Sequence, residues 1–283
     1  MKLIITVLVL ALLLGLTFFL VKRPEADGGL VITSPEMAEI VALVAGVEPI
    51  AAVVAECDWP PAMRELPRVG SFGNVELQAV AALRPSLVFT ASPSQDALTA
   101  RLNTLGIAAQ SLPLRSVNDL LSAMRHVGEL TGNPARATIV ADSLAEAFAA
   151  VRADTLYAMR VYVEVSPGFW TTSGGSLLGE AVRLAGGAGL FENADWDYAQ
   201  VAQADVVIAD PDVILALYPG VSVADIAARK GWSRVSAVQT GRVFTTDDID
   251  PDLLVRCGPR LPLGVACLKA LLRGGEEAAH ERP

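Results

Sequence analysis

The sequence predicts an α/β protein of two Rossmann-like lobes, each with a mostly parallel sheet, because one pattern occurs twice along the chain. In both copies an apolar helical stretch leads into a charged residue and a proline, and then into a short apolar strand. The copies are Asn74–Phe89, ending Arg84-Pro85-Ser86-Leu87-Val88-Phe89, and Val201–Leu215, ending Asp210-Pro211-Asp212-Val213-Ile214-Leu215. Two similar lobes leave a cleft between them, and clefts between domains are where small molecules usually bind. The pattern therefore favours capture of a small molecule over chemistry.

Alternating strands and helices predict the parallel sheet of the first lobe. The series begins with strand Leu30–Thr33, and Ser34-Pro35-Glu36 is typical of a helix start with proline at the first helical position. Apolar periodicity then predicts the helix Met37–Ala45, closed by Gly46. The further elements expected here are strands Pro49–Ala55, Ser86–Thr90 and Ile107–Leu112, and helices Val75–Leu83 and Asp96–Leu105.

A long helix is expected to join the lobes. Helix Val117–Thr131 ends at Gly132-Asn133-Pro134, and the alanine-rich stretch Ala135–Leu156 that follows contains no glycine or proline. At a rise of 1.5 Å per residue such a helix reaches roughly 33 Å, the width of a small domain, so it would form a rigid spine. The second lobe is expected to contain strand Arg160–Val165, a turn at Ser173-Gly174-Gly175, helix Leu177–Leu184, the second repeat, strand Arg242–Thr246 and helix Leu263–Leu272. The predicted divisions are a membrane segment at 1–24, lobes at 30–132 and 158–273, the spine at 133–157 and a frayed, charged tail at 274–283.

Composition limits the classes of function. The chain has 283 residues, 52% of them hydrophobic, which suffices for two modest domains and excludes a disordered protein. Lys2, Lys22 and Arg23 precede the first acidic residue, so the rest of the chain is more acidic than the formal net charge of −9 indicates. An acidic body repels phosphate, so we expect no nucleic-acid partner. Any docking partner is expected to be basic.

The N-terminal segment is expected to meet a membrane. Leu3–Val21 is apolar or small apart from Thr6 and Thr17, which is close to the ~20 residues that span a bilayer as a helix. The apolar region of a signal peptide is usually ~7–15 residues long and ends in small residues, whereas Lys22-Arg23-Pro24 follows here. No cysteine for lipid attachment lies near the end of the run. We expect an uncleaved anchor, with a cleaved signal as the alternative.

Cysteine and histidine usage gives no support to a metal site or to catalysis. Cys57, Cys257 and Cys267 allow at most one intramolecular disulfide, and their spacing resembles no zinc site. We expect buried free thiols, with a Cys57–Cys257 bond across the cleft as the alternative. The two histidines, His126 and His280, do not belong to any evident acid–base or nucleophile set. The sequence therefore predicts no enzyme, no metal and no cofactor other than a carried ligand.

Three segments combine aromatic and charged residues in loops at strand ends, where open α/β sheets place their ligands. They are Glu56–Pro61, Gly168–Thr171 and Asp247–Arg260. Aromatic rings there can stack on a large apolar ring system, while aspartate and arginine supply directed polar contacts. The predicted ligand residues are Cys57, Asp58, Trp59, Phe72, Phe169, Trp170, Tyr198, Asp252 and Arg256. For each aromatic residue, ordinary packing under a loop is the alternative.

Several short motifs follow one another along Leu30–Leu272. They are Cys57-Asp58-Trp59-Pro60-Pro61, Leu66-Pro67-Arg68-Val69-Gly70, Asn74-Val75-Glu76, Leu83-Arg84-Pro85-Ser86-Leu87-Val88, Thr172-Ser173-Gly174-Gly175-Ser176, Gly186-Gly187, Asp210-Pro211-Asp212-Val213-Ile214 and Arg256-Cys257-Gly258-Pro259-Arg260-Leu261. This ordered set resembles the periplasmic substrate-binding proteins of ATP-driven (ABC) importers, of the helical-backbone class that carries cobalamin, haem and ferric siderophores. The first and last motifs are most similar to those of cobalamin-binding members.

The resemblance implies an extracytoplasmic, membrane-tethered monomer that holds a cobalamin-like corrinoid and delivers it to the importer's membrane subunits. It places Trp59, Phe72 and Tyr198 around the corrin, and Asp252 and Arg256 near its polar rim. Ferric siderophore or haem is the alternative ligand of the same class. A tethered sensor without transport and an enzyme acting on a small metabolite are alternatives of other classes.

Relatives of this class dock through one acidic residue on each lobe, which meets arginines of the membrane subunits. By resemblance, Glu76 is the docking acid of the first lobe, with a solvated helix residue as the alternative. In the second lobe Ala204 occupies the usual acidic position, and Asp205 is its neighbour. One residue further along a helix a side chain points about 100° away, so Asp205 is an imperfect substitute. The missing acid at Ala204 is the motive for the sensor alternative.

Overall fold

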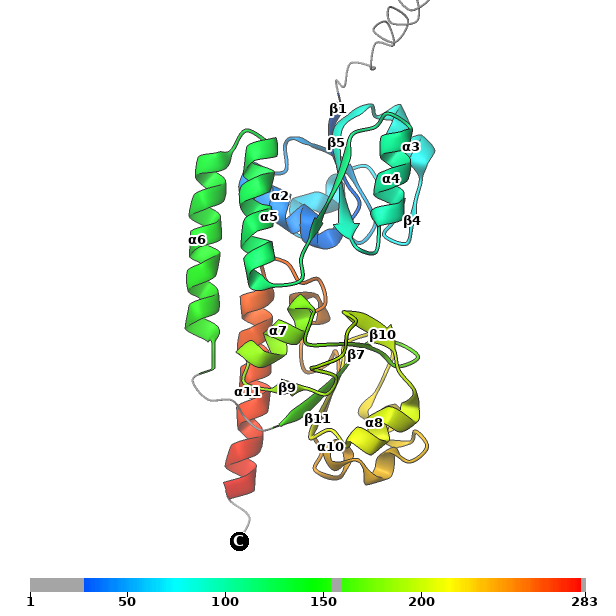
Figure 1. Cartoon of the computed structure of the whole chain (residues 1–283), viewed down its shortest axis with the longest axis vertical. Helices are drawn as coiled ribbons and strands as arrows, with labels where there is room; N and C mark the ends of the chain where they lie inside the picture. Colours follow the sequence, from blue (N-terminus) through cyan, green and yellow to red (C-terminus); the bar gives the residue numbers. More distant parts are fainter. Residues whose placement is uncertain (1–27, 154–158, 281–283) are drawn as a thin grey trace, which may run out of the picture.

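The computed structural model of the chain describes residues 28–153 and 159–280. Figure 1 shows two lobes, one above the other, with helices α5, α6 and α11 along one side of the molecule. The expected anchor at Leu3–Val21 lies outside the described residues. Within the described ranges no helix is long and apolar enough to cross a membrane.

The N-terminal lobe contains a four-stranded parallel sheet in the order β2-β1-β5-β6, as the alternating pattern predicts. Its strands are β1 (Gly28–Ile32), β2 (Ile50–Val53), β5 (Pro85–Ser92) and β6 (Ala109–Pro113), with a hairpin of β3 (Gly70–Ser71) and β4 (Asn74–Val75) beside them. Its helices are α2 (Pro35–Ala45), the 3-10 turn η1 (Pro61–Glu65), α3 (Leu77–Ala82), α4 (Asp96–Thr104) and α5 (Val117–Leu130). The predicted start of α2 is confirmed, because Ser34 caps it by accepting a hydrogen bond from the Met37 backbone N–H.

The C-terminal lobe has a mixed sheet in the order β10-β8-β7-β11-β12, with β9 beside β7. The strands are β7 (Arg160–Ser166), β8 (Trp170–Thr172), β9 (Ala188–Gly189), β10 (Tyr198–Gln200), β11 (Val213–Ala216) and β12 (Val243–Phe244). The helical elements are α7 (Leu177–Leu184), α8 (Gln203–Ala209), α9 (Val223–Ala227), η2 (Trp232–Arg234), α10 (Ser236–Gln239), η3 (Pro251–Leu253) and α11 (Leu261–His280). β8 and β10 are antiparallel to their neighbours, so the sheet is parallel only in part.

Helix α6 (Pro134–Val151) joins the lobes by packing against α2 and α5 of the first and α11 of the second. It ends at Val151, before the predicted limit of the spine at 157, because contacts with the second lobe begin at this point. Lys269 donates hydrogen bonds to the carbonyls of Val151 (3.2 Å) and Arg152 (2.9 Å), and the Ala153 N–H donates to Leu184 O (2.8 Å). These partners satisfy carbonyl groups that a helix end leaves unpaired.

The C-terminal helix extends further along the chain than expected. Helix α11 continues to His280, whereas fraying from Gly274 onwards was predicted. The residues after the two glycines, Glu276-Glu277-Ala278-Ala279, have high helix propensity, and they outweigh the cost of Gly274 and Gly275. The predicted fray is therefore wrong up to residue 280.

The internal repeat corresponds to equivalent elements in the two lobes. Each copy is a short helix followed by a strand that begins at or just after a proline: α3 and β5 in the first lobe, α8 and β11 in the second. Glu76 is the residue before the first turn of α3, and Ala202 holds the same place before α8. One hydrophobic core runs through the first lobe, the joining helices and part of the second, and a smaller cluster around Trp232 lies within the second lobe.

Candidate functional site

Two arginines of the loop after β12 contact the first helix of the other lobe. Arg260 donates to Oε1 of Glu39 from Nε (3.1 Å) and Nη2 (2.7 Å), and Glu39 is only 1% exposed. Arg256 donates from Nη1 to Asp58 (2.7 Å), and its Nη2 lies 2.6 Å from Asp252 of its own loop. Bidentate or paired contacts of this kind fix both partners in direction as well as distance. The loop is therefore bound to the N-terminal lobe by charge.

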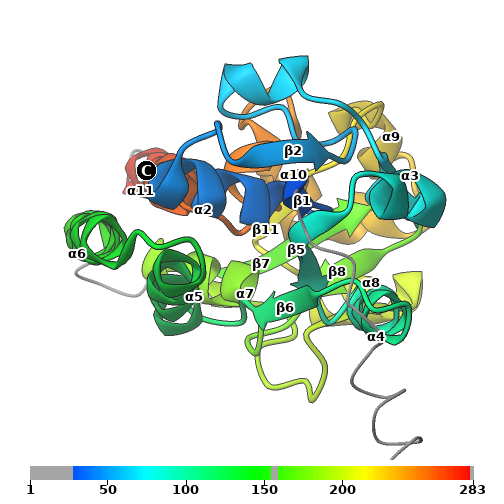
Figure 2. The same ribbon diagram turned by 90° about the horizontal axis from the view of Figure 1, so that it is seen from above.

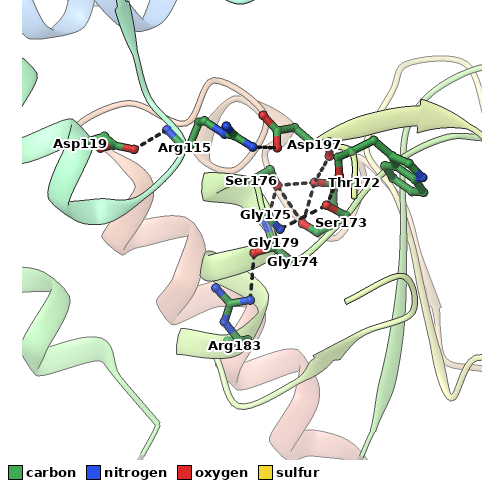
Figure 3. A network of polar contacts seen from close by, with 11 residues as sticks. Arg115, Asp119, Thr172, Ser173, Gly174, Gly175, Ser176, Gly179, Arg183 and Asp197 are labelled. Carbon is green, nitrogen blue, oxygen red and sulfur yellow. Dashed lines mark hydrogen bonds and ion pairs between the residues drawn. The ribbon is translucent and has the colours of Figure 1, made fainter. Parts of the chain in front are cut away.

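A second set of polar contacts joins the lobes near the start of α5. Arg115 lies 2.5 Å from Asp197, and the Val117 N–H donates to Glu180 of α7 at 2.7 Å. Figure 3 shows that Arg115 lies next to the turn Thr172–Ser176, whose hydroxyl groups bond to one another and to the backbone around Asp197. Ser176 also caps α7 through the Gly179 N–H at 2.9 Å. These contacts hold the start of α5 against the C-terminal lobe.

Partly exposed aromatic side chains come from both lobes. Trp170 and Tyr198 are diagonal neighbours on one face of the β8–β10 pair, and each is 42% exposed. The Oη of Tyr198 lies 3.8 Å from Sγ of Cys257, so this face is turned toward the loop that meets the first lobe. In the first lobe, Trp59 has the guanidinium of Arg260 over its ring at 5.1 Å. We call Asp58, Trp59, Trp170, Tyr198, Asp252, Arg256 and Arg260 the inter-lobe surface.

Two of the predicted ligand residues lie elsewhere. Cys57 is 1% exposed in the main core, so it presents no surface to a ligand, and that prediction is corrected. Phe169 packs against Trp232, with ring centroids 6.0 Å apart, and against the guanidinium of Arg229. Phe169 lies in the turn before β8 with a φ of 65°, so its side chain does not follow the alternation of the strand. Phe169 therefore stabilises the smaller core instead of facing the other lobe.

Phe72 lies in the turn between β3 and β4, at a pocket of the N-terminal lobe. Its N–H donates to Glu56 Oε2 at 2.8 Å and its carbonyl accepts from Gln95 at 2.9 Å. The bond to Glu56 holds Phe72 against the loop that also carries Asp58 and Trp59, and its predicted role as a ligand contact stays a prediction.

A buried ion pair includes an acidic residue of β7, the strand next to β8. Glu164 of β7 is 0% exposed and accepts from Arg229 at 2.6 Å and 3.0 Å, and from the Tyr218 hydroxyl at 2.8 Å. Arg229 in turn lies over the ring of Trp232 at 4.6 Å. The carboxylate is thus fully paired, as a buried charge must be. It fixes β7, to which β8 is hydrogen-bonded.

Burial and ion pairing shift the pKa values of the acidic groups at the lobe junction. Desolvation raises the pKa of Glu36, in the first turn of α2, to about 7. Burial also raises the pKa of Glu39, against the opposing effect of Arg260. Burial opposes ionisation of Asp58 too, but the hydrogen bond and charge of Arg256 outweigh it and lower the pKa of Asp58. The carboxyl groups at the junction therefore have pKa values shifted in opposite directions, according to whether burial or a paired arginine dominates.

The thiols are free in the structure, as expected. Cys57 and Cys257 are buried, as expected, but Cys267 is exposed, so the expectation of a buried thiol is wrong there. Burial raises the pKa of both Cys57 and Cys257 to about 12, so neither is a reactive thiolate at neutral pH. Among residues 28–153 and 159–280, no group of three potential ligands is placed to hold a metal ion.

Glu36 makes the stability of the fold depend on pH. Its folded pKa of about 7 exceeds the ordinary value of 4.5, so between these values the folded chain retains a proton that the unfolded chain releases. Stability contributed by this group is therefore present at low pH and decreases as pH rises toward 7. We expect the thermal midpoint of Glu36→Gln, which cannot titrate, to fall less than that of the unmodified protein between pH 5 and pH 7.5. Parallel curves from thermal unfolding at a series of pH values would show that Glu36 does not titrate in this range.

Several residues that build the site were not predicted from the sequence. Glu39 and Glu164 are single acidic residues within apolar stretches that predict a helix and a strand. A carboxylate in such a position must find a buried partner, and this is a signal that sequence reasoning can use. Their partners, Arg260 and Arg229, lie 221 and 65 residues away along the chain. Only the signal for a buried acid, and not the identity of the partner, is present in the sequence.

Comparison with known proteins identifies the family. The profile of a family described as "Periplasmic binding protein" matches residues 30–249. The chain belongs to the periplasmic binding protein family. This confirms the class that the ordered motifs predict.

Individual relatives are similar over most of the chain. An "Uncharacterized ABC transporter substrate-binding lipoprotein YvrC" of Bacillus subtilis is 28% identical over 231 residues, which are 76% of this chain and 70% of the relative. A "Vitamin B12-binding protein" of Salmonella paratyphi A is 26% identical over 211 residues, 72% of this chain and 76% of the relative. The periplasmic haem-binding protein RhuT from Roseiflexus, solved in its apo form, has a TM-score of 0.75 at 19% identity, covering 87% of this chain and 97% of that one. At that identity the last likeness establishes the fold alone.

The two predicted docking acids lie on equivalent helices of this periplasmic binding protein. Glu76 is exposed, and its side chain makes no capping bond to α3. Asp205 is exposed in the first turn of α8, while the true counterpart of Glu76 in the repeat is Ala202. In both views α3 and α8 lie on the side of the molecule away from α6 (Figures 1 and 2). One side of the protein therefore presents an acid from each lobe.

Proposed function

We propose that this periplasmic binding protein is the substrate-binding component of an ABC importer and carries a cobalamin-like corrinoid at the inter-lobe surface. The ligand would lie between Trp59 of one lobe and the pair Trp170 and Tyr198 of the other. Aromatic rings of this exposure supply large, flat contact area for a macrocycle. The relatives named as an ABC transporter lipoprotein and as a vitamin B12-binding protein support this assignment.

The observation that carries the choice of ligand is the pairing of the arginines. Arg115 is paired with Asp197, and Arg260 with Glu39. Arg256 lies between Asp58 and Asp252, at 2.7 Å and 2.6 Å. An anionic ligand would have to break such pairs and leave a carboxylate without its partner, which is costly when that carboxylate is buried.

The carried ligand is therefore expected to lack strong negative charge. Haem presents propionate groups, and ferric siderophores are often anionic, so both would compete with the internal carboxylates for guanidinium groups. The rim of a corrinoid consists largely of neutral amides, which can accept a hydrogen bond from an arginine that keeps its acidic partner. On this ground we assign a corrinoid ahead of haem or a siderophore.

The exposed acidic residues would guide delivery of the ligand to the importer. Glu76 and Asp205 would pair with basic residues of the importer's membrane subunits, and such charges orient docking more than they add affinity. The protein would act as a monomer at the extracytoplasmic face, held there by the apolar segment Leu3–Val21.

Titration of the purified protein tests the ligand. We expect stoichiometric binding of cobalamin, followed by visible absorption and by calorimetry, and much weaker binding of haem and of a ferric siderophore measured in parallel. Tight binding of haem or siderophore without cobalamin would overturn the charge argument and leave the transport role in place. Binding of none of the three would overturn the assignment of the inter-lobe surface.

A further inference from the structure

Trp59 of the inter-lobe surface is not fixed by the core of its own lobe. Its side chain is half-buried, and among residues 28–153 and 159–280 it belongs to neither hydrophobic cluster. The backbone just before it is fixed, because Cys57 is 1% exposed in the core and its carbonyl accepts from Arg68 Nη1 at 2.9 Å. The loop is therefore anchored up to residue 57, while the indole ring depends on contacts from elsewhere.

The contact on the ring comes from the other lobe. The guanidinium carbon of Arg260 lies 5.1 Å from the ring centroid of Trp59, within the ~6 Å at which a cation attracts an aromatic face. A planar guanidinium can stack on an aromatic face while its edge donates to a carboxylate, whereas lysine carries a compact point charge. The neighbouring Asp58 accepts from Arg256 at 2.7 Å. One loop of the C-terminal lobe thus holds both the ring and the residue beside it.

Arg260 is itself fixed at both ends. Its backbone belongs to the turn before α11, where its carbonyl accepts from the Leu263 N–H at 3.0 Å. Its Nε and Nη2 both donate to Oε1 of Glu39, which is 1% exposed on α2 of the N-terminal lobe. The loop also lies close to α2, since a Cβ at Gly258 would be 3.1 Å from Oε2 of Glu39. The guanidinium cannot shift along the ring without loss of these bonds.

We propose that Glu39 and Arg260 are positioning residues that hold the ring of Trp59 in place for the ligand. Glu39 sets the place of the guanidinium, and the guanidinium lies over the indole. Glu39 and Trp59 belong to one lobe and Arg260 to the other, so the ring is held only while the lobes keep this arrangement. A ring that is fixed before binding loses less conformational entropy when the ligand arrives, which raises affinity. This role rests on the proposed function, in which Trp59 contacts the ligand.

A double-mutant cycle tests whether Arg260 acts through the ring. We expect Arg260→Met to weaken cobalamin binding about five-fold, within the range of coupling between residues in contact. In the Trp59→Ala background the same change should alter the Kd less than about two-fold, because the ring on which it acts is absent. Calorimetric titration of the purified full-length variants measures both factors. An equal loss in the two backgrounds would mean that Arg260 acts on the ligand without Trp59, and would overturn the proposal.

The variant Arg260→Lys separates positioning from charge. It keeps a cation beside the buried carboxylate of Glu39, and Arg256 Nη1 remains 3.6 Å from the same oxygen, so the thermal midpoint should fall little. We nevertheless expect its cobalamin affinity to fall about as far as that of Arg260→Met, because an ammonium group cannot both bind the carboxylate and lie flat on the ring. Full affinity in Arg260→Lys would show that charge alone is sufficient, which contradicts the proposal.

Fluorine NMR follows the ring without any ligand. In protein labelled with fluorotryptophan, the resonance that Trp59→Phe removes belongs to Trp59. Arg260→Met and Glu39→Gln should both shift this resonance. Arg115→Met is the matched control, because Arg115 pairs with Asp197 across the lobes at a place that does not include Trp59, and it should leave the resonance unchanged. A Trp59 resonance that does not move in Arg260→Met would overturn the proposal.

The titration and the NMR experiment together distinguish failure of the positioning role from failure of the proposed function. If the unmodified protein binds no cobalamin, the proposed function fails whatever the Trp59 resonance does. If the unmodified protein and Arg260→Met bind cobalamin equally well, the function stands and the positioning role is wrong.

Discussion

Replacing Trp170 by alanine is expected to weaken cobalamin binding about ten-fold or more, because truncating an aromatic anchor commonly costs at least ~1.4 kcal/mol of binding free energy. Trp170 is 42% exposed, so its removal takes little from the core. The thermal midpoint should therefore stay close to that of the unmodified protein, and calorimetric titration should show the loss as a higher Kd.

Neighbouring variants serve as controls for this effect. Tyr198→Ala should lose affinity as Trp170→Ala does, whereas Tyr198→Phe retains the ring and removes only the hydroxyl near Cys257. Phe169→Ala should lower the midpoint of unfolding, because Phe169 packs on Trp232 and Arg229. Unchanged cobalamin affinity in both Trp170→Ala and Tyr198→Ala would rule out the exposed aromatic pair as the binding surface.

Removal of Arg229 is expected to cause the largest loss of stability of any single change discussed for this protein. Arg229→Ala leaves the fully buried carboxylate of Glu164 without its cation, and breaking a buried pair from one side typically costs ~3–5 kcal/mol. The variant also loses the guanidinium that packs on the rings of Phe169 and Trp232. Denaturant unfolding measures the difference in free energy.

An exposed ion pair gives the matched comparison. Arg160 and Asp212 are also hydrogen-bonded, but their side chains are 46% and 33% exposed. Solvent screens such pairs, and Arg160→Ala is expected to cost only about 1 kcal/mol or less. Equal losses in Arg160→Ala and Arg229→Ala would contradict the assignment of Glu164 as a buried charge that depends on its partner. The double variant Glu164→Leu with Arg229→Met should recover much of the stability that Arg229→Ala loses.

Local signals in the sequence predicted most elements of the fold. The serine and proline before Met37 specify the start of α2, because the cap and the fixed proline φ act within one turn of chain. The repeated helix–proline–strand pattern predicted two similar lobes, and α3–β5 with α8–β11 confirms it. The antiparallel strands β8 and β10 were missed because strands of three residues give too short a pattern to show alternation.

The candidate site was predicted in part. Aromatic and charged loops at strand ends indicated Trp59, Trp170 and Tyr198, and their exposure is compatible with contact to a ligand. Cys57 and Phe169 were included because they adjoin those residues in sequence, but their side chains pack against the two hydrophobic clusters. The structure pairs Arg256 with Asp58 and Asp252, which the sequence did not indicate, and its contact with the ligand stays a prediction.

The sequence by itself determined the family, the two lobes, the joining helix and the aromatic character of the loops at strand ends, since these depend on periodicity, caps and motif order. The tertiary structure decided which charges are free and which are paired. Glu39 meets Arg260, and Asp58 meets Arg256, across separations of 221 and 198 residues, and no local pattern encodes such a pairing. Electrostatic energy depends on distance and burial, which exist only once the chain has folded. For that reason the charge preference for the ligand follows from the fold and not from the list of residues.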